Sequence, residues 1–140
     1  MTSITIPVDL GERSYSIVVE PGSLHRAADH IGAWFQRDRA VIVTDSHVAE
    51  TQLPVLQQAL EAAGIQCHPI ILPAGESTKS WQHLSTLCDE LLTFGIERKD
   101  DIIALGGGVI GDLTGFAAAI LLRILGVPQI GRASCRERVS

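Results

Sequence analysis

A cluster of glycines between a strand-like and a helix-like stretch gives the first indication of chemistry. Between the apolar run 102–105 and the helical pattern 113–122 stand Gly106, Gly107, Gly108 and Gly111. The pattern Gly-x-Gly-x-x-Gly between a strand and a helix is the dinucleotide-binding fingerprint, in which bare backbone N–H groups meet a pyrophosphate. The fingerprint is incomplete, because no acidic residue ends a strand about twenty positions further on. The alternative is a tight turn whose glycines supply positive φ angles.

Asp112 follows these glycines directly and limits what the turn can bind. A carboxylate facing a pyrophosphate would repel it, so we expect Asp112 to face an uncharged group such as a ribose hydroxyl or a carboxamide. The alternative is that Asp112 only caps the helix start and interacts with its dipole.

A second polar segment, "LPAGESTKS" at residues 72–80, spans a strand end and a helix start. Its Glu76 and Lys79 place charges where a ligand of the sheet would lie, and Ser77 is a candidate helix cap. The alternative is a solvated capping region with no ligand, which the spacing alone favours.

Apolar periodicity gives the elements that must position these residues. Alternation predicts a hairpin over residues 3–8 and 15–20. The rest of the pattern predicts a helix over 21–35, a strand over 40–45, a helix over 48–63, a strand over 67–73, a helix over 80–95, a strand over 101–105 and a helix over 113–122. Strands that alternate with helices indicate an α/β fold with a Rossmann-like, mainly parallel sheet. Ligands of such sheets bind beyond the carboxyl ends of the strands.

Two of these elements carry sharper expectations. The strand "AVIVTD" is a continuous apolar run, which is typical of a parallel strand buried on both faces. The helix over 80–95 is expected to end at Gly95 and to bury one stripe, made of Trp81, Leu84, Cys88 and Leu91, with Leu87 and Leu92 beside it.

Composition excludes several classes of protein. The formal net charge of −5 argues against a nucleic-acid surface, and 46% hydrophobic residues suffice for a core. The pattern predicts neither a membrane span nor a secretory signal. Three unpatterned cysteines indicate a reducing cytoplasm. None of the five histidines has metal-ligand spacing, so no metal site is expected in this chain.

Residues 1–123 resemble 3-dehydroquinate synthase, a member of the sugar-phosphate cyclase superfamily. The resemblance rests on "LPAGESTKS", on "ERKDDIIALGGGVIGDLTGFAAA" and on Arg123. Related dehydrogenases usually carry Gly-Gly-Gly-Ser-x-x-Asp, whereas Val109 and Gly111 of this chain favour the synthase. The combination is specific, although each short motif alone is not.

The resemblance implies an activity and its cofactors. NAD would transiently oxidise a ring hydroxyl of 3-deoxy-D-arabino-heptulosonate 7-phosphate, and phosphate elimination and an aldol closure would give 3-dehydroquinate. A divalent metal, zinc or cobalt, would be held in a helical C-terminal domain that this chain lacks. The enzyme would be a cytoplasmic homodimer of the shikimate pathway with a sugar-phosphate substrate, no nucleic acid and no membrane.

The resemblance also assigns roles to residues. Asp45 would lie near the adenosine end of NAD, and Asp112 on its nicotinamide side. Arg123 would reach the substrate phosphate in the neighbouring subunit. Two segments complete the cofactor contacts: a ribose-side group of Ala74, Gly75, Glu76, Ser77, Thr78 and Lys79, and a pyrophosphate cradle of Gly107, Gly108, Val109, Ile110 and Gly111.

The family pattern stops after Arg123. Residues 124–140 read "ILGVPQIGRASCRERVS", with three arginines in the last nine residues and no apolar pattern, and we interpret them as an atypical tail. The chain would then be an NAD-binding domain over 1–123 and inactive alone. Two alternatives stay open: a related NAD-dependent cyclase or glycerol or iron-type alcohol dehydrogenase, and a non-catalytic nucleotide-binding module.

Overall fold

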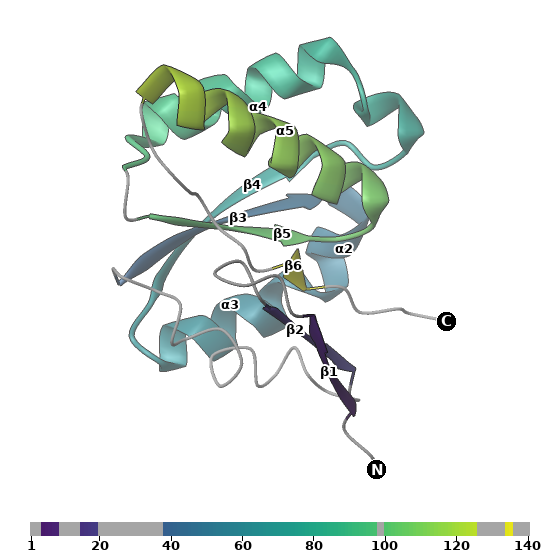
Figure 1. The fold of residues 1–140 in the computed structure, drawn as a ribbon, viewed down its shortest axis with the longest axis vertical. Coiled ribbons are helices and arrows are strands. Elements are labelled where there is room, and N and C mark those ends of the chain that lie inside the picture. Colours follow the sequence, from purple (N-terminus) through teal and green to yellow (C-terminus); the bar gives the residue numbers. More distant parts are fainter. Residues whose placement is uncertain (1–3, 9–14, 20–37, 98–99, 126–133, 136–140) are drawn as a thin grey trace.

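The computed structural model describes residues 4–8, 15–19, 38–97, 100–125 and 134–135. Over these residues the chain forms a parallel four-stranded sheet with the strand order β4-β3-β5-β6, and a two-stranded hairpin (Figure 1). The α/β class and the parallel sheet expected from the sequence are confirmed. The helix expected over 21–35 lies outside the described residues.

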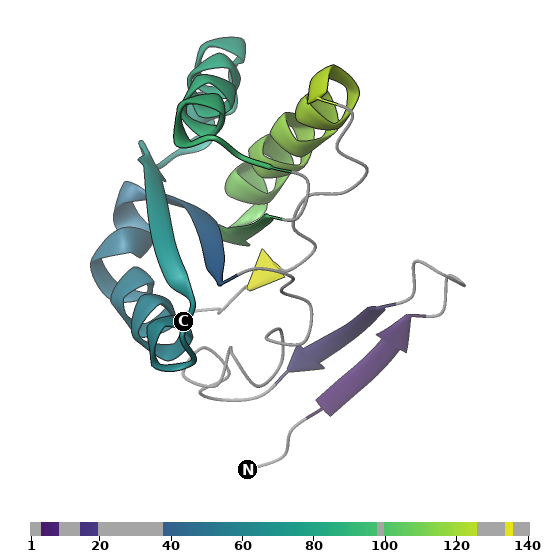
Figure 2. The ribbon, with the colours of Figure 1, turned by 90° about the vertical axis from the view of Figure 1, so that its left-hand side faces the viewer.

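The hairpin is the expected antiparallel pair. Strand β1 (Ile4–Val8) pairs with β2 (Tyr15–Val19), from Ile4 opposite Val19 to Val8 opposite Tyr15. The strand bounds lie within one residue of those that the alternating pattern predicts. Figure 2 shows this hairpin beside the larger sheet.

Strand β3 (Arg39–Asp45) lies in the interior of the sheet, between β4 (Gln66–Leu72) and β5 (Asp101–Leu105). Residues 40–44 are at most 1% exposed, because helices cover the sheet on both sides. This burial explains why β3 has no alternating pattern. Strand β6 (Ser134–Cys135) pairs with the far edge of β5.

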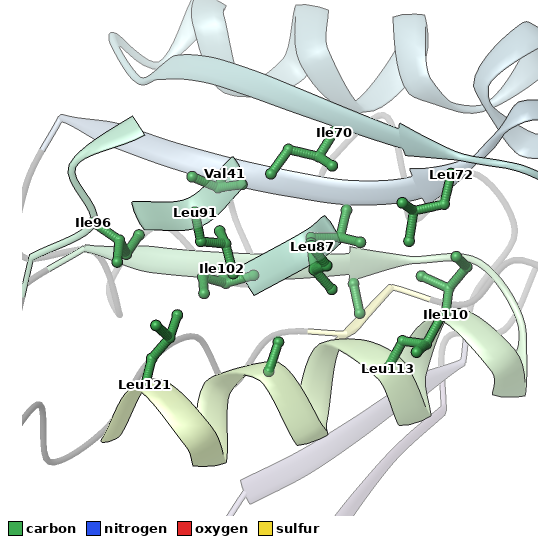
Figure 3. Packing of buried hydrophobic residues seen from close by; sticks show 13 residues of the cluster. Val41, Ile70, Leu72, Leu87, Leu91, Ile96, Ile102, Ile110, Leu113 and Leu121 are labelled. Carbon is green, nitrogen blue, oxygen red and sulfur yellow. The ribbon is translucent and has the colours of Figure 1, made fainter. Parts of the chain in front are cut away.

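Four helices of the described part form the outer layers. Helices α4 (Trp81–Phe94) and α5 (Gly108–Leu125) cover one face of the sheet, and α2 (Ser46–Thr51) and α3 (Leu53–Ala62) cover the other (Figures 1 and 2). The larger core cluster fills the space under α4 and α5 (Figure 3). Its labelled members are Val41, Ile70, Leu72, Leu87, Leu91, Ile96, Ile102, Ile110, Leu113 and Leu121.

The single helix expected over 48–63 is wrong in detail, because two helices occupy this stretch. Helix α2 ends at Thr51 and α3 begins at Leu53, with Gln52 between them. Pro54 lies in the first turn of α3, where its missing N–H costs no helical hydrogen bond. Proline would break a continuous helix at this point, so the chain starts a new one.

The buried stripe expected on α4 is only partly correct. Leu87 and Leu91 are fully buried, whereas the Trp81 side chain is 76% exposed. The core cluster contacts α4 from Leu84 onward, and Trp81 in the first turn is not among its residues. Helical spacing identifies the inward face of a helix, but it does not tell which turns the sheet covers.

Gly95 ends α4 in the left-handed conformation, as expected, with φ +83° and ψ 44°. A Cβ atom built there would meet nothing within 4 Å, so alanine would cost backbone strain alone. We expect Gly95→Ala to lower the free energy of unfolding by roughly 1 kcal/mol. Gly115→Ala is the matched control, since Gly115 is exposed inside α5, and it should stabilise by up to about 1 kcal/mol. Equal urea midpoints for the two variants would contradict this account.

Candidate functional site

Three loops begin side by side at the carboxyl edge of the sheet. Asp45 at the end of β3 pairs with Leu72 of β4, and the preceding Thr44 pairs with Leu105 of β5. The loops that follow carry the polar residues singled out from the sequence. Parallel strands with matched ends therefore bring these loops to one edge, where ligands of such sheets bind.

In the glycine turn, only Gly106 has a positive φ among residues 106–108. Its φ is +151°, and a Cβ atom there would lie 3.3 Å from Cγ1 of Ile110. At Gly107 and Gly108 φ is not positive, and an added Cβ would meet nothing within 4 Å. Neither backbone conformation nor packing of the described residues explains the absence of side chains at these two positions. They present bare backbone to open space.

Helix α5 begins inside the glycine pattern, which corrects the expected start near residue 113. It starts at Gly108, and the amide of Gly111 donates to the Gly107 carbonyl at 3.1 Å. Ile110 is buried in the core cluster and Val109, which is partly buried, packs against it. The turn therefore places the free amides of a helix N-terminus at the carboxyl edge of the sheet.

The loop after β4 is held by its own hydrogen bonds. Thr78 is fully buried and its hydroxyl donates to the Pro73 carbonyl, while its amide donates to the Gly75 carbonyl at 3.1 Å. Ser80, not Ser77, caps α4, because the Ser80 hydroxyl accepts from the His83 amide at 3.3 Å. The short turn Glu76–Thr78 separates the strand end from this cap.

A contact that the sequence did not indicate ties two of the loops together. The Ala74 amide donates to the hydroxyl of Ser46 at 3.1 Å. Asp45 caps α2, since its Oδ1 accepts from the amides of His47 and Val48 at 2.9 and 2.8 Å. A serine or aspartate at a strand end only weakly indicates a contact between loops or with a ligand, because most such residues only cap the next helix.

Lys79 and Asp112 come together across the site. Lys79 Nζ lies 2.9 Å from Asp112 Oδ2, and both side chains are about half exposed. Asp112 is not the cap of α5, since the helix begins at Gly108. The capping interpretation of Asp112 is therefore wrong, and the carboxylate instead connects α5 to the loop after β4.

Two assigned side chains lie outside the described part, those of Glu76 and Arg123. The backbone of Arg123 is near the far end of α5, about 16 Å along the helix axis from Asp112 at 1.5 Å per residue. Within this chain, Arg123 and the glycine turn are at opposite ends of one helix.

The described residues support neither a metal site nor a reactive cysteine. No three of their histidine, cysteine, aspartate and glutamate side chains gather as metal ligands. Burial raises the pKa of the Cys67 thiol to about 11, and burial also raises the pKa of Cys88. Both thiols stay protonated near neutral pH and are poor nucleophiles. No helix in the same residues is long and apolar enough to cross a membrane.

Residues 69–134 match the family described as 3-dehydroquinate synthase N-terminal. The 3-dehydroquinate synthase of Zymomonas mobilis is 50% identical over 121 residues, which is 86% of this chain. Over most of its own length the chain is similar to the N-terminal part of 3-dehydroquinate synthases. It spans about a third of the length of the curated relatives that it matches, 32% for the Zymomonas mobilis enzyme.

Two solved structures of related synthases share the fold of this chain. A 2-deoxy-scyllo-inosose synthase complexed with carbaglucose-6-phosphate, NAD+ and Co2+ matches 95% of the chain and 34% of its own length, with 21% identity and a TM-score of 0.75. The 2-epi-5-epi-valiolone synthase of Streptomyces hygroscopicus, with NAD+ and Zn2+ bound, matches 92% and 33%, with 28% identity and a TM-score of 0.69.

Proposed function

We propose that this chain is the NAD-binding part of a 3-dehydroquinate synthase, a lyase of the shikimate pathway. The substrate would be 3-deoxy-D-arabino-heptulosonate 7-phosphate, and the products 3-dehydroquinate and phosphate. The observation that carries the proposal is the bare backbone of Gly107 and Gly108 at the start of α5. Identity of 50% to a synthase, against 28% to a related cyclase, favours this reaction over that of the cyclases.

The described residues fit a dinucleotide. The free amides at the start of α5 could bind a pyrophosphate, and Gly107 and Gly108 have no side chain to obstruct it in the open space beside them. In this proposal Asp45 would contact the adenosine end of NAD. The loop of residues 74–79 would contact the ribose, and Asp112 the nicotinamide side. NAD would supply a reversible hydride transfer to and from a ring hydroxyl of the substrate.

The described residues do not fit a metal site, so zinc or cobalt would need ligands from outside them. We infer that the NAD-binding domain spans residues 1–123 and that residues 124–140 form an atypical tail. We also infer a cytoplasmic homodimer, in which Arg123 reaches the substrate phosphate of the neighbouring subunit. The position of Arg123 near the far end of α5 supports this arrangement.

A chimera tests the proposed activity. Residues 1–125 of this chain would replace the corresponding region of the Zymomonas mobilis enzyme, whose 50% identity makes the domain contacts compatible. We expect the chimera, with NAD+ and zinc, to release phosphate from 3-deoxy-D-arabino-heptulosonate 7-phosphate. We expect the 140-residue chain alone to release none, because its described residues offer no metal ligands.

The controls separate folding from chemistry. The parent enzyme measures full activity, and the chimera with Asp112→Asn should keep its melting temperature but lose turnover. A folded chimera that binds NAD+ and releases no phosphate would contradict the assignment to this reaction. Phosphate release by the chain alone would contradict the need for further residues.

A further inference from the structure

The outer face of helix α5 carries apolar and small residues where a surface helix ordinarily carries polar ones. Gly115, Phe116 and Ala119 are exposed on this face, and Phe116 is 59% exposed. The opposite face of α5 packs into the core cluster through residues such as Ile110 and Leu121, so the exposed residues are not needed for the core of this chain. A large aromatic residue beside small ones on an exposed helix face is typical of a surface that packs against another helix.

The two ends of this face carry opposite charges. Asp112 comes one helical turn before Phe116, on the same face. Arg123 comes one turn after Ala119, which also keeps it on that face. The Asp112 carboxylate is half exposed beside Lys79, so it remains open to a further cation.

The order of these residues makes the face complementary to itself. The midpoint between Asp112 and Arg123 is also the midpoint between Phe116 and Ala119, and it falls between residues 117 and 118. A twofold axis at this point would set Asp112 opposite Arg123 of a second, antiparallel α5. It would also set Phe116 opposite Ala119, so that a large residue meets a small one.

We propose that α5 packs antiparallel against α5 of a second copy of this chain, with Phe116 and Ala119 in contact around this twofold axis. The inference rests on the homodimer of the proposed function and specifies which surfaces meet. Arg123 is about 16 Å along the helix from Asp112 of its own chain, but in the pair it lies beside Asp112 of the second copy. Each proposed NAD site then receives a cation from the other copy.

The chimera with the Zymomonas mobilis enzyme is the protein for the test, because one helix pair buries less surface than a stable dimer needs. Sedimentation velocity would give the dissociation constant of its dimer. We expect Phe116→Lys and Ala119→Glu, made separately, each to raise that constant about a hundredfold, since each places an unpaired charge at the apolar centre of the pair. A monomeric unsubstituted chimera would overturn the inference, and so would a constant that either substitution leaves unchanged.

A mixture of the two variants tests the register. In the antiparallel pair the new ammonium at position 116 of one copy faces the new carboxylate at position 119 of the other, and the second contact keeps Phe116 against Ala119. We expect the mixed dimer to recover to within about fivefold of the unsubstituted constant. No recovery would overturn the inference. Copies with Phe116→Lys and Phe116→Glu would face each other only in a parallel pair, so a stronger recovery by that mixture would also overturn it.

Matched controls add the same charges elsewhere. Gln58 is exposed on α3, which covers the opposite face of the sheet, and Gln58→Lys and Gln58→Glu should leave the dissociation constant unchanged. A hundredfold loss there would move the interface to the other face and overturn the inference. Melting curves of all variants confirm that each one folds.

The dimer measurements need no turnover, so they separate this inference from the proposed reaction. A chimera that dimerises as expected and releases no phosphate contradicts only the reaction. An active chimera whose dimer withstands Phe116→Lys contradicts only the pairing of α5.

Discussion

Replacing Gly108 with alanine is expected to leave the chain folded and to weaken NAD+ binding about a hundredfold. Gly108 has no positive φ, and a Cβ atom there would meet no protein atom within 4 Å. Alanine also favours the helix that begins at this residue, so unfolding should cost the same or up to about 1 kcal/mol more. The new methyl group would instead fill the space that a pyrophosphate needs.

Gly106→Ala is the control for a structural glycine. Its φ of +151° and the 3.3 Å approach to Ile110 Cγ1 predict a loss of about 1–3 kcal/mol of stability. Calorimetric titration with NAD+ beside a melting curve separates the two roles. If Gly108→Ala melted early and kept its NAD+ affinity, the glycine would serve the turn and not a ligand.

The second large effect is expected at the opposite edge of the sheet, where Arg39 pairs with buried Asp100. Nε of Arg39 donates to Oδ1 of Asp100 at 2.8 Å, and Nη2 donates to Oδ2 at 2.5 Å. The Asp100 side chain is 1% exposed, and that of Arg39 25%. The hydrogen bond to Asp100 raises the pKa of Arg39, so the guanidinium stays charged at any ordinary pH.

Arg39→Met should lower the free energy of unfolding by about 3 kcal/mol, because it removes a cation that donates two hydrogen bonds to a buried carboxylate. The variant also loses the stacking of the guanidinium 4.6 Å above the Phe94 ring and its bond to the Gly95 carbonyl. Urea denaturation gives the measurement. The substitution lies far from the glycine turn and should not change NAD+ affinity in the folded chain.

Two further variants test the mechanism of this loss. Arg39→Lys keeps the charge but not the planar fork, and it should lose about half as much stability. The double variant Arg39→Met with Asp100→Leu should recover most of it, because the buried charge is gone. A single Arg39→Met variant with an unchanged urea midpoint would contradict the role of the pair.

The sequence by itself determined the parallel sheet and the position of its edge. Residues 40–43 and 102–105 are continuous apolar runs, and only strands covered on both faces bury every residue. The end of α4 at Gly95 could also be predicted from the sequence, because the left-handed backbone conformation at a helix end favours glycine. Local chemistry sufficed for these features because each depends on neighbouring residues alone.

The boundaries of the helices were harder to predict from the sequence, because two local preferences competed. Pro54 divides the stretch expected as one helix, and Gly108 begins a helix whose apolar pattern starts later. The sequence also could not tell that Trp81 lies beyond the sheet while Leu91 lies beneath it. Burial depends on which turns of a helix the sheet covers, and that is a property of the packed layers.

Only the tertiary structure decided which charged residues meet. The strand order β4-β3-β5 places the loop after β4 and the start of α5 on the same edge, so Lys79 reaches Asp112. The same order brings Arg39 to Asp100 at the other edge, across 61 residues of chain. No local pattern encodes these pairs, because their distance is set by how strands stack and not by spacing along the sequence.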